Sequence, residues 1–149
     1  EIAQCLVGSE MCIRDRRYQK DVIVAEVSMG FTMEDYADRE KLAPKERKGM
    51  ATKPHLAEAV EYPMTPEGQA AFMQKVMERI AQVPDGRGKG FYYWEPAWIP
   101  VPGCGWANEE SLKYIQDPGP GGNEWANQAL FDYDGNALPA LKVIRDFQK

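Results

Sequence analysis

The sequence is poor in residues that form covalent or metal cross-links. It has three cysteines and one histidine in 149 residues. Cys5 and Cys12 lie near the N-terminus and leave only Cys104 in the rest of the chain, so no disulfide framework is evident. Nothing near Cys104 resembles an activating base, which argues against a catalytic thiol. The single histidine, His55, excludes a multi-histidine metal site, and its position in a loop favours a plain surface role.

Long apolar runs and excess positive charge are also missing. No stretch approaches the roughly 18 apolar residues that indicate a transmembrane helix, so we expect no membrane span. The net charge of −5 argues against a nucleic-acid partner, because the phosphate backbone attracts positively charged surfaces. The mixed charges between Asp38 and Lys53 are typical of a solvated loop face.

The N-terminal segment is unlike the rest of the chain. Residues 4–16 resemble a translated sequencing-adapter sequence found at the edges of many unrelated predicted genes, and their apolar core is too short for a signal peptide. We therefore interpret residues 1–16 as a non-native leader and exclude them from the fold. The genuine sequence is expected to cover residues 17–149. Continuous coding sequence at the source locus that matches the first 16 residues would contradict this interpretation.

One buried strand is predicted from Asp21 to Ser28. Its near-continuous apolar run is typical of a parallel strand covered on both faces. With a period of two, Val22, Val24 and Glu26 share one face of the strand. A carboxylate near the end of such a run is costly to bury without partners. Glu26 is therefore a candidate functional residue, and a structural ion pair is the alternative explanation.

A second strand is predicted in the stretch FYYWEPAWI, residues 91–99, which holds five aromatic residues and one carboxylate. The aromatics favour a strand, and Pro96 prevents the strand from continuing. Trp94, Glu95 and Trp98 then lie where the strand gives way to a loop. Indole faces beside a carboxylate suit a sugar ring, which offers C–H groups on its faces and hydroxyls round its edge. The alternative is a hydrophobic core strand with one exposed glutamate.

A helix is predicted between the two strands. Thr65 is a good N-cap and Pro66 fits the first helical position, although Gly68 occupies the place where a full capping box has Glu or Gln. The helix carries an apolar stripe that we interpret as core packing rather than a cofactor site, formed by Phe72, Met73, Val76, Met77, Ile80 and Val83. A turn at residues 84–86 ends it. A last helix is predicted from Leu138 to Phe147.

The element order is therefore strand, long loop, helix, strand, long loop, helix, as in an alternating α/β barrel or open sheet. The loops at residues 29–63 and 96–137 are rich in aromatics, whereas disordered tracts are poor in them. Short helices are predicted within these loops at Glu34–Leu42 and Ser111–Ile115. In alternating barrels the loops after the strands build the active site, so we expect the chemistry near Glu26, Trp94 and Glu95.

Four segments resemble a known family: VIVAEVSMGFT, YPMTPEGQAAF, GRGKGFYYWEPAWIP and GNEWANQALFDYDGNALPAL. Over about residues 18–148 the chain resembles the C-terminal portion of glycoside hydrolase family 53, the arabinogalactan endo-β-1,4-galactanases. The resemblance implies the α/β class and the C-terminal portion of a (β/α)8 TIM barrel, about strands seven and eight with their helices. Residues 22–27 would form strand seven, and residues 91–94 strand eight.

The resemblance also implies a function, namely a retaining, endo-acting glycosidase that cleaves β-1,4-galactan in pectin side chains and works outside the cell or in the periplasm. Glu26 matches the family's catalytic nucleophile. Trp94, Glu95 and Trp98 match the end of strand eight that lines the substrate site. The family's acid/base glutamate follows strand four, which lies upstream of everything present here, so we expect the chain alone to be inactive.

Two alternatives stay open at this point. Glu95 could supply the missing acid, although its matching position in the family does not. The chain could also be a non-catalytic carbohydrate-binding module that uses the same aromatics. Glu26 favours the enzyme, because a binding module has no need for a carboxylate at an apolar strand end.

Calcium is not expected. Many family members carry a D-G-D-G-H-x-N run after strand seven that helps to hold calcium between the last two loops. The matching run here is Asp35 to Lys41. Its Ala, Arg and Lys offer no side-chain oxygen at the ligand positions, and calcium requires oxygen ligands. We therefore predict no metal and no cofactor.

Overall fold

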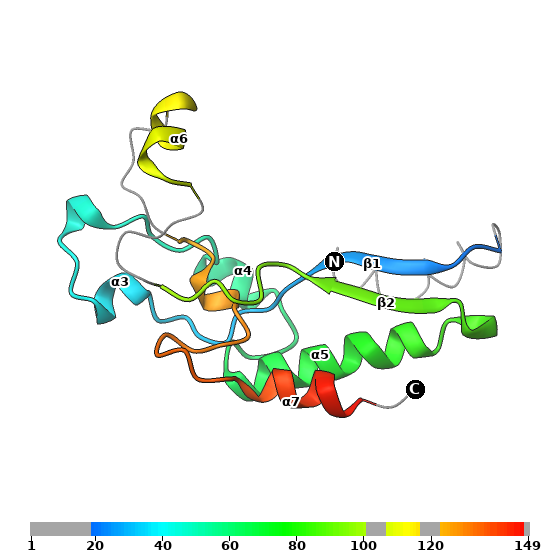
Figure 1. The fold of residues 1–149 in the computed structure, drawn as a ribbon. Coiled ribbons are helices and arrows are strands. Elements are labelled where there is room, and N and C mark those ends of the chain that lie inside the picture. Colours follow the sequence, from blue (N-terminus) through cyan, green and yellow to red (C-terminus); the bar gives the residue numbers. More distant parts are fainter. Residues whose placement is uncertain (1–18, 101–106, 117–122, 148–149) are drawn as a thin grey trace.

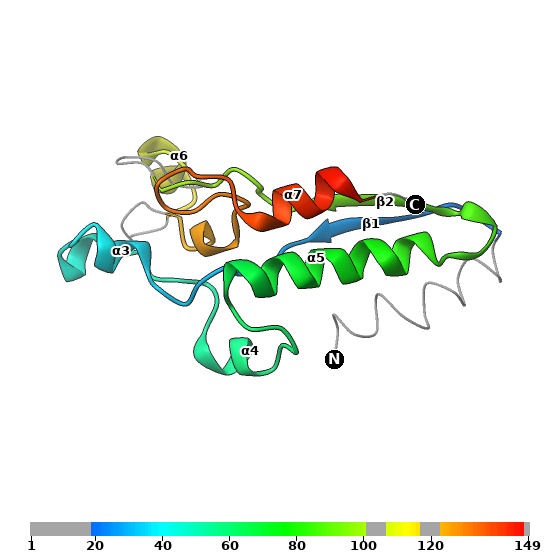
Figure 2. The same ribbon diagram turned by 90° about the horizontal axis from the view of Figure 1, so that it is seen from below.

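The fold centres on two parallel strands and the helix that joins them. The structure is a computed structural model that describes residues 19–100, 107–116 and 123–147. Strand β1 (Val22–Val27) pairs with strand β2 (Gly88–Tyr93), and helix α5 (Pro66–Ala81) connects them. The C-terminal helix α7 (Pro139–Asp146) packs along α5, and both helices lie on the same side of the sheet (Figures 1 and 2). The predicted strand–helix–strand crossover is confirmed.

The N-terminus of α5 forms as the sequence predicts. The Thr65 hydroxyl accepts the Gly68 N–H at 3.0 Å, and Pro66 is the first helical residue. Gly68 is buried, and a Cβ atom there would lie 1.9 Å from the carbonyl oxygen of Pro63. A Glu or Gln therefore has no room at this position, which explains why the capping box is incomplete.

The apolar stripe of α5 is core, as predicted. Its Met73, Val76 and Ile80 are almost fully buried. Val76, Ile80 and Val83 pack against apolar residues of both strands, and Met73 packs in a second cluster with Leu130 and Ala140. The Met-rich part of the stripe therefore fills the interior rather than a cofactor site.

The register of the strands contains a bulge next to Glu26. Val24 pairs with Phe91 and Val27 pairs with Tyr93, so β1 has one residue more than β2 between these pairs. Val27 consequently joins Val24 in the layer that packs against α5, while Glu26 is exposed. The alternation predicted for Val22, Val24 and Glu26 is therefore interrupted before Glu26. Bulges are common beside active sites, where they re-aim a side chain.

The face of the sheet away from the helices is uncovered among the described residues. Ile23 of β1 is 52% exposed and Tyr92 of β2 is 67% exposed. The expectation that the first strand is covered on both faces is thus wrong for the part of the chain that the structure describes. The physical reason is that its helices all lie on one side of the two strands or beyond their ends (Figures 1 and 2).

Several element boundaries differ from the prediction. β2 begins at Gly88 rather than Phe91, because pairing with β1 draws residues 88–90 into the sheet despite their two glycines. In α7, Leu138 is the N-cap and Phe147 the C-cap, so the helix is shorter than the predicted 138–147. The earlier start of β2 follows from pairing with a strand that lies far away in the sequence.

The short loop helices also form with different bounds. Helix α3 (Tyr36–Arg39) is shorter than predicted, and the Asp35 side chain caps it. Helix α6 (Glu109–Tyr114) starts earlier than predicted, with Asn108 as its cap. Helix α4 (Pro54–Glu58) and the 3-10 turns η1 (Pro44–Glu46), η2 (Pro84–Gly86) and η3 (Ala126–Gln128) complete the described elements.

The two long loops pack on each other at the carboxyl ends of the strands, on the left in Figure 1. They share a small core of Phe31, Tyr36, Ala126, Tyr133 and Leu138. The rings of Phe31 and Tyr36 meet that of Tyr133 edge to face, with centroids 5.3 and 6.3 Å apart. Elsewhere in the first loop, His55 is exposed on α4, in agreement with a surface role.

Candidate functional site

Glu26 and Trp94 lie at the joined carboxyl ends of β1 and β2. The Trp94 N–H donates to the Val27 carbonyl at 2.9 Å, and Val27 pairs with Tyr93. Val27 and Tyr93 pack toward the helices, whereas Glu26 is exposed and Trp94 is 44% exposed. Because neighbours along a strand point to opposite faces, Glu26 and Trp94 share the uncovered face at the end where the loops begin.

Glu95 and Trp98 lie in the turn and loop that follow β2. Glu95 has a φ of 52°, a left-handed conformation that costs a non-glycine residue about 1 kcal/mol. This conformation turns the chain out of the strand, and the side chain is half-buried. The Trp98 carbonyl accepts the Asn123 side-chain amide at 3.3 Å, which ties Trp98 to the far part of the second long loop. The backbone thus fixes Glu95 beside Trp94 and carries Trp98 further into the loop.

A buried polar cluster lies beneath these ends. Gln69, in the first turns of α5, is fully buried, and its amide nitrogen donates to the carbonyls of Met29 at 2.8 Å and Ala129 at 2.9 Å. The Tyr93 hydroxyl donates to the Gln128 carbonyl at 2.8 Å. Burial raises the pKa of Tyr93 to about 12, so this hydroxyl remains a donor at physiological pH.

A chain of side-chain hydrogen bonds joins the end of β1 to both long loops. The Ser28 hydroxyl donates to the Gln128 side-chain carbonyl, and the Gln128 amide nitrogen donates to the Thr52 hydroxyl at 3.1 Å. These residues, together with Gln69 and Tyr93, were not found from the sequence. One signal was available, because Gln69 continues the apolar stripe one turn before Met73, where a polar side chain stands out.

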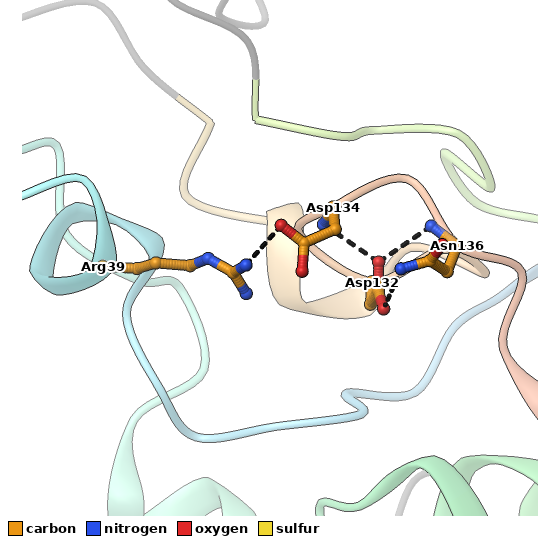
Figure 3. A network of polar contacts seen from close by, with 4 residues as sticks. All are labelled: Arg39, Asp132, Asp134 and Asn136. Atoms are coloured by element: carbon orange, nitrogen blue, oxygen red, sulfur yellow. Dashed lines mark hydrogen bonds and ion pairs between the residues drawn. The ribbon is translucent and has the colours of Figure 1, made fainter.

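A charged contact also links the two long loops (Figure 3). Arg39 at the end of α3 pairs with Asp134. Asp132 accepts the backbone N–H groups of Asp134 at 2.9 Å and Asn136 at 2.8 Å, and the Asn136 side-chain amide at 3.0 Å. Burial acts to raise the pKa of Asp132, but these hydrogen bonds and the Arg39 charge outweigh it and lower that pKa. The turn is therefore organised around an ionised Asp132.

The loop after β1 does not fit the calcium ion that the family resemblance implies. Asp35 accepts the Ala37 N–H at 2.9 Å, Asp38 pairs with Arg47, and Arg39 pairs with Asp134. Two guanidinium groups thus neutralise carboxylates that a calcium ion would require. Within the described ranges, no group of three or more Asp, Glu, His or Cys side chains is placed to hold a metal.

We therefore predict that calcium does not stabilise the full-length protein. A ligand present at 100 times its Kd raises the free energy of unfolding by about 2.7 kcal/mol. Thermal unfolding with excess calcium and with a chelator should give the same melting temperature, because Arg39 and Arg47 already balance the loop carboxylates. A rise in melting temperature with calcium that disappears on chelation would contradict this prediction.

Comparisons with known proteins agree with this architecture. Residues 9–144 match glycosyl hydrolase family 53. The chain is 36% identical over 146 residues to the endo-β-1,4-galactanase of Bacillus subtilis, and the alignment covers 86% of this chain and 32% of that protein. The family 53 catalytic domain of Ignisphaera aggregans is 32% identical with a TM-score of 0.67, covering 87% of this chain and 31% of that one.

A fungal β-1,4-galactanase structure shows the same fold at 21% identity, with a TM-score of 0.53, covering 97% of this chain and 33% of that one. The chain thus spans about a third of the length of these relatives. None of the described helices is long and apolar enough to cross a membrane.

The family match begins inside the segment 1–16, which we interpreted as a leader. That segment and Cys104 lie outside the described residues, and the origin of the segment stays a prediction. The match nonetheless covers most of the chain, and the relatives are galactanases of a TIM-barrel family. The chain belongs to glycosyl hydrolase family 53.

Proposed function

We propose that this chain is part of a retaining endo-β-1,4-galactanase, in which β1 and β2 are strands seven and eight of the barrel. Parallel strands joined by a helix are the repeating unit of such a barrel. The uncovered face with Ile23 and Tyr92 is the side that would face the barrel interior. The chain spans only about a third of its relatives, so further strands of a longer protein would cover this face.

The observation that carries the proposal is the position of Glu26. It is an exposed carboxylate at the carboxyl end of a parallel strand, on the same face as Trp94. Retaining glycosidases place two carboxyl groups about 5–5.5 Å apart. In this proposal Glu26 attacks the anomeric carbon and forms a covalent glycosyl ester, while an acid from another part of the barrel protonates the leaving oxygen. Water then hydrolyses the ester.

The local environment supports the role of Glu26 as nucleophile. An attacking carboxylate must stay ionised, which requires contact with water or hydrogen-bond donors rather than a dry apolar pocket. The bulge between Val24 and Val27 keeps Glu26 out of the apolar layer against α5. Burial there would favour the protonated form, which cannot attack.

The aromatic residues after β2 would bind the polysaccharide. Trp94 is 44% exposed, on the same face of the sheet as the nucleophile, and we assign it apolar contact with a galactose ring. Glu95 and Trp98 are assigned further substrate contacts, with the Glu95 carboxylate accepting sugar hydroxyls. By family resemblance, the enzyme would act outside the cell or in the periplasm.

The function is tested by incubating the full-length protein with β-1,4-galactan. We expect internal cleavage, and proton NMR of the early products should show the β-anomer first, because a double displacement retains the configuration. An α-anomer first would contradict the retaining mechanism. Binding of galactan without cleavage would favour the alternative, a carbohydrate-binding module built on Trp94.

The 149-residue chain alone is predicted to give no hydrolysis. The two described strands leave open edges and an uncovered apolar face, and the family resemblance places the acid/base glutamate after strand four, outside the two strands proposed here. The measurement is reducing-sugar release from galactan by the purified chain, compared with its Glu26→Ala variant. Release above the level of that variant would refute the prediction.

A further inference from the structure

We propose that Gln69 is a positioning residue for Glu26. Gln69 and Tyr93 together anchor the backbone of Met29, and this anchor keeps Glu26 in its strand register. This inference rests on the proposed function of Glu26. It concerns a side chain on α5 that reaches neither the exposed face of the sheet nor a sugar bound there, since Gln69 is fully buried.

The anchoring is visible in the hydrogen bonds of Met29. Its N–H donates to the Tyr93 hydroxyl at 3.3 Å, and its carbonyl accepts the Gln69 amide nitrogen at 2.8 Å. Both backbone polar groups of Met29 are thus bonded to side chains. Met29 follows the end of β1 and lies three residues after Glu26, where strand pairing no longer fixes the chain.

The same two side chains also hold the second loop. Gln69 donates to the Ala129 carbonyl at 2.9 Å, and Tyr93 donates to the Gln128 carbonyl at 2.8 Å. An amide is suited to this task because it carries two N–H groups for two carbonyls. Without these donors, buried carbonyls would lose their partners, which is costly in an apolar interior.

An apolar side chain would suit this place better if packing alone mattered. Gln69 continues the stripe that contains Met73, Val76 and Ile80, and its side-chain oxygen has no hydrogen-bond partner among the described residues. A methionine of similar length would leave no such oxygen. The polar contacts of Gln69 therefore have a role besides packing.

That role follows from the bulge in β1. The extra residue between Val24 and Val27 is what separates Glu26 from the layer against α5. A shift of one residue in register moves every side chain of a strand to the other face. With Met29 fixed at both its N–H and its carbonyl, β1 cannot slide to remove the bulge. Losing the anchor would let Glu26 turn toward α5 and away from the substrate.

The test compares Gln69→Met with Gln74→Met in the full-length protein. Gln74 lies on the same helix, but its amide donates to Glu78 of that helix at 3.0 Å. We expect Gln69→Met to lower kcat for galactan by about 10²-fold, the effect of a misplacement of roughly 1 Å. KM should stay within about threefold, since the sugar contacts are untouched, and Gln74→Met should match the wild type.

A second variant and a measurement of amide hydrogen exchange distinguish loss of the anchor from misfolding. Tyr93→Phe removes only the hydroxyl and should also lower kcat with little change in KM. In the wild type, the Met29 amide should exchange with solvent as slowly as the Trp94 amide, which donates to the carbonyl of Val27 in β1. Rapid exchange at Met29 would overturn the proposal, and so would wild-type kcat in folded Gln69→Met and Tyr93→Phe proteins.

The failure of this inference can be told apart from that of the proposed function. If Glu26→Ala abolishes hydrolysis but both anchor variants keep wild-type kcat, only the positioning role is wrong. If Glu26→Ala hydrolyses galactan as fast as the wild type, the proposed nucleophile is wrong and Gln69 has nothing to position.

Discussion

Replacing Glu26 with alanine in the full-length protein is expected to lower kcat for β-1,4-galactan by at least about 10³-fold. The variant loses the carboxylate that forms the glycosyl ester in the proposed mechanism. Folding should be unaffected, because Glu26 is exposed and lies outside the apolar layer of β1. The measurement is steady-state hydrolysis, with melting temperature as the check on folding.

A matched pair separates the loss of the nucleophile from a general loss of charge. Glu26→Gln and Glu78→Gln each remove one negative charge with little change in shape. Glu78 lies in the second half of α5, away from the carboxyl ends of the strands, and contacts Gln74 and Lys75 of its own helix. We expect Glu78→Gln to retain full activity. Added azide should restore turnover of an activated galactoside by Glu26→Ala, since it fits the vacated space. Undiminished hydrolysis by Glu26→Ala would refute the assignment.

The strand–helix–strand crossover could be predicted because the sequence signals for the start of α5 and for its buried face indicate the same helix. Thr65 and Pro66 mark the start of α5, and its buried residues recur at the helical period. Glu26 is singled out by a similar local signal, because a glutamate is out of place in an apolar run, and its catalytic role stays a prediction. In these cases the residue and its nearest neighbours carry enough information.

The bulge and the polar cluster could not be predicted because they depend on distant partners. The extra residue before Val27 is visible only from its pairing with Tyr93. Gln69 is bonded to Met29 and Ala129, which are far from it in the sequence. The same holds for the core that the two loops share around Tyr133. Because of the bulge, Glu26 lies on the other face of β1 from Val22 and Val24, whereas the period of two predicted one shared face.

The largest loss of stability is expected from Gly88→Ala, at the start of β2. Gly88 is buried, and a Cβ atom there would lie 1.8 Å from the carbonyl oxygen of Ile80 and 2.8 Å from its carbon. Both atoms belong to the backbone of α5 and cannot rotate away. Either α5 or β2 must move, and the layer that holds Val76 and Val24 would loosen. We expect the free energy of unfolding to fall by about 3 kcal/mol or more.

Gly86→Ala is the control that isolates this close approach from the other effects of replacing glycine. Gly86 lies two residues earlier with a φ of +64°, and nothing lies within 4 Å of the position of its Cβ atom. Only the left-handed backbone should oppose the methyl group there, at a cost of about 1 kcal/mol. Urea unfolding of the full-length protein and both variants gives the comparison. Equal losses would show that α5 does not pack against Gly88 as closely as the distance indicates.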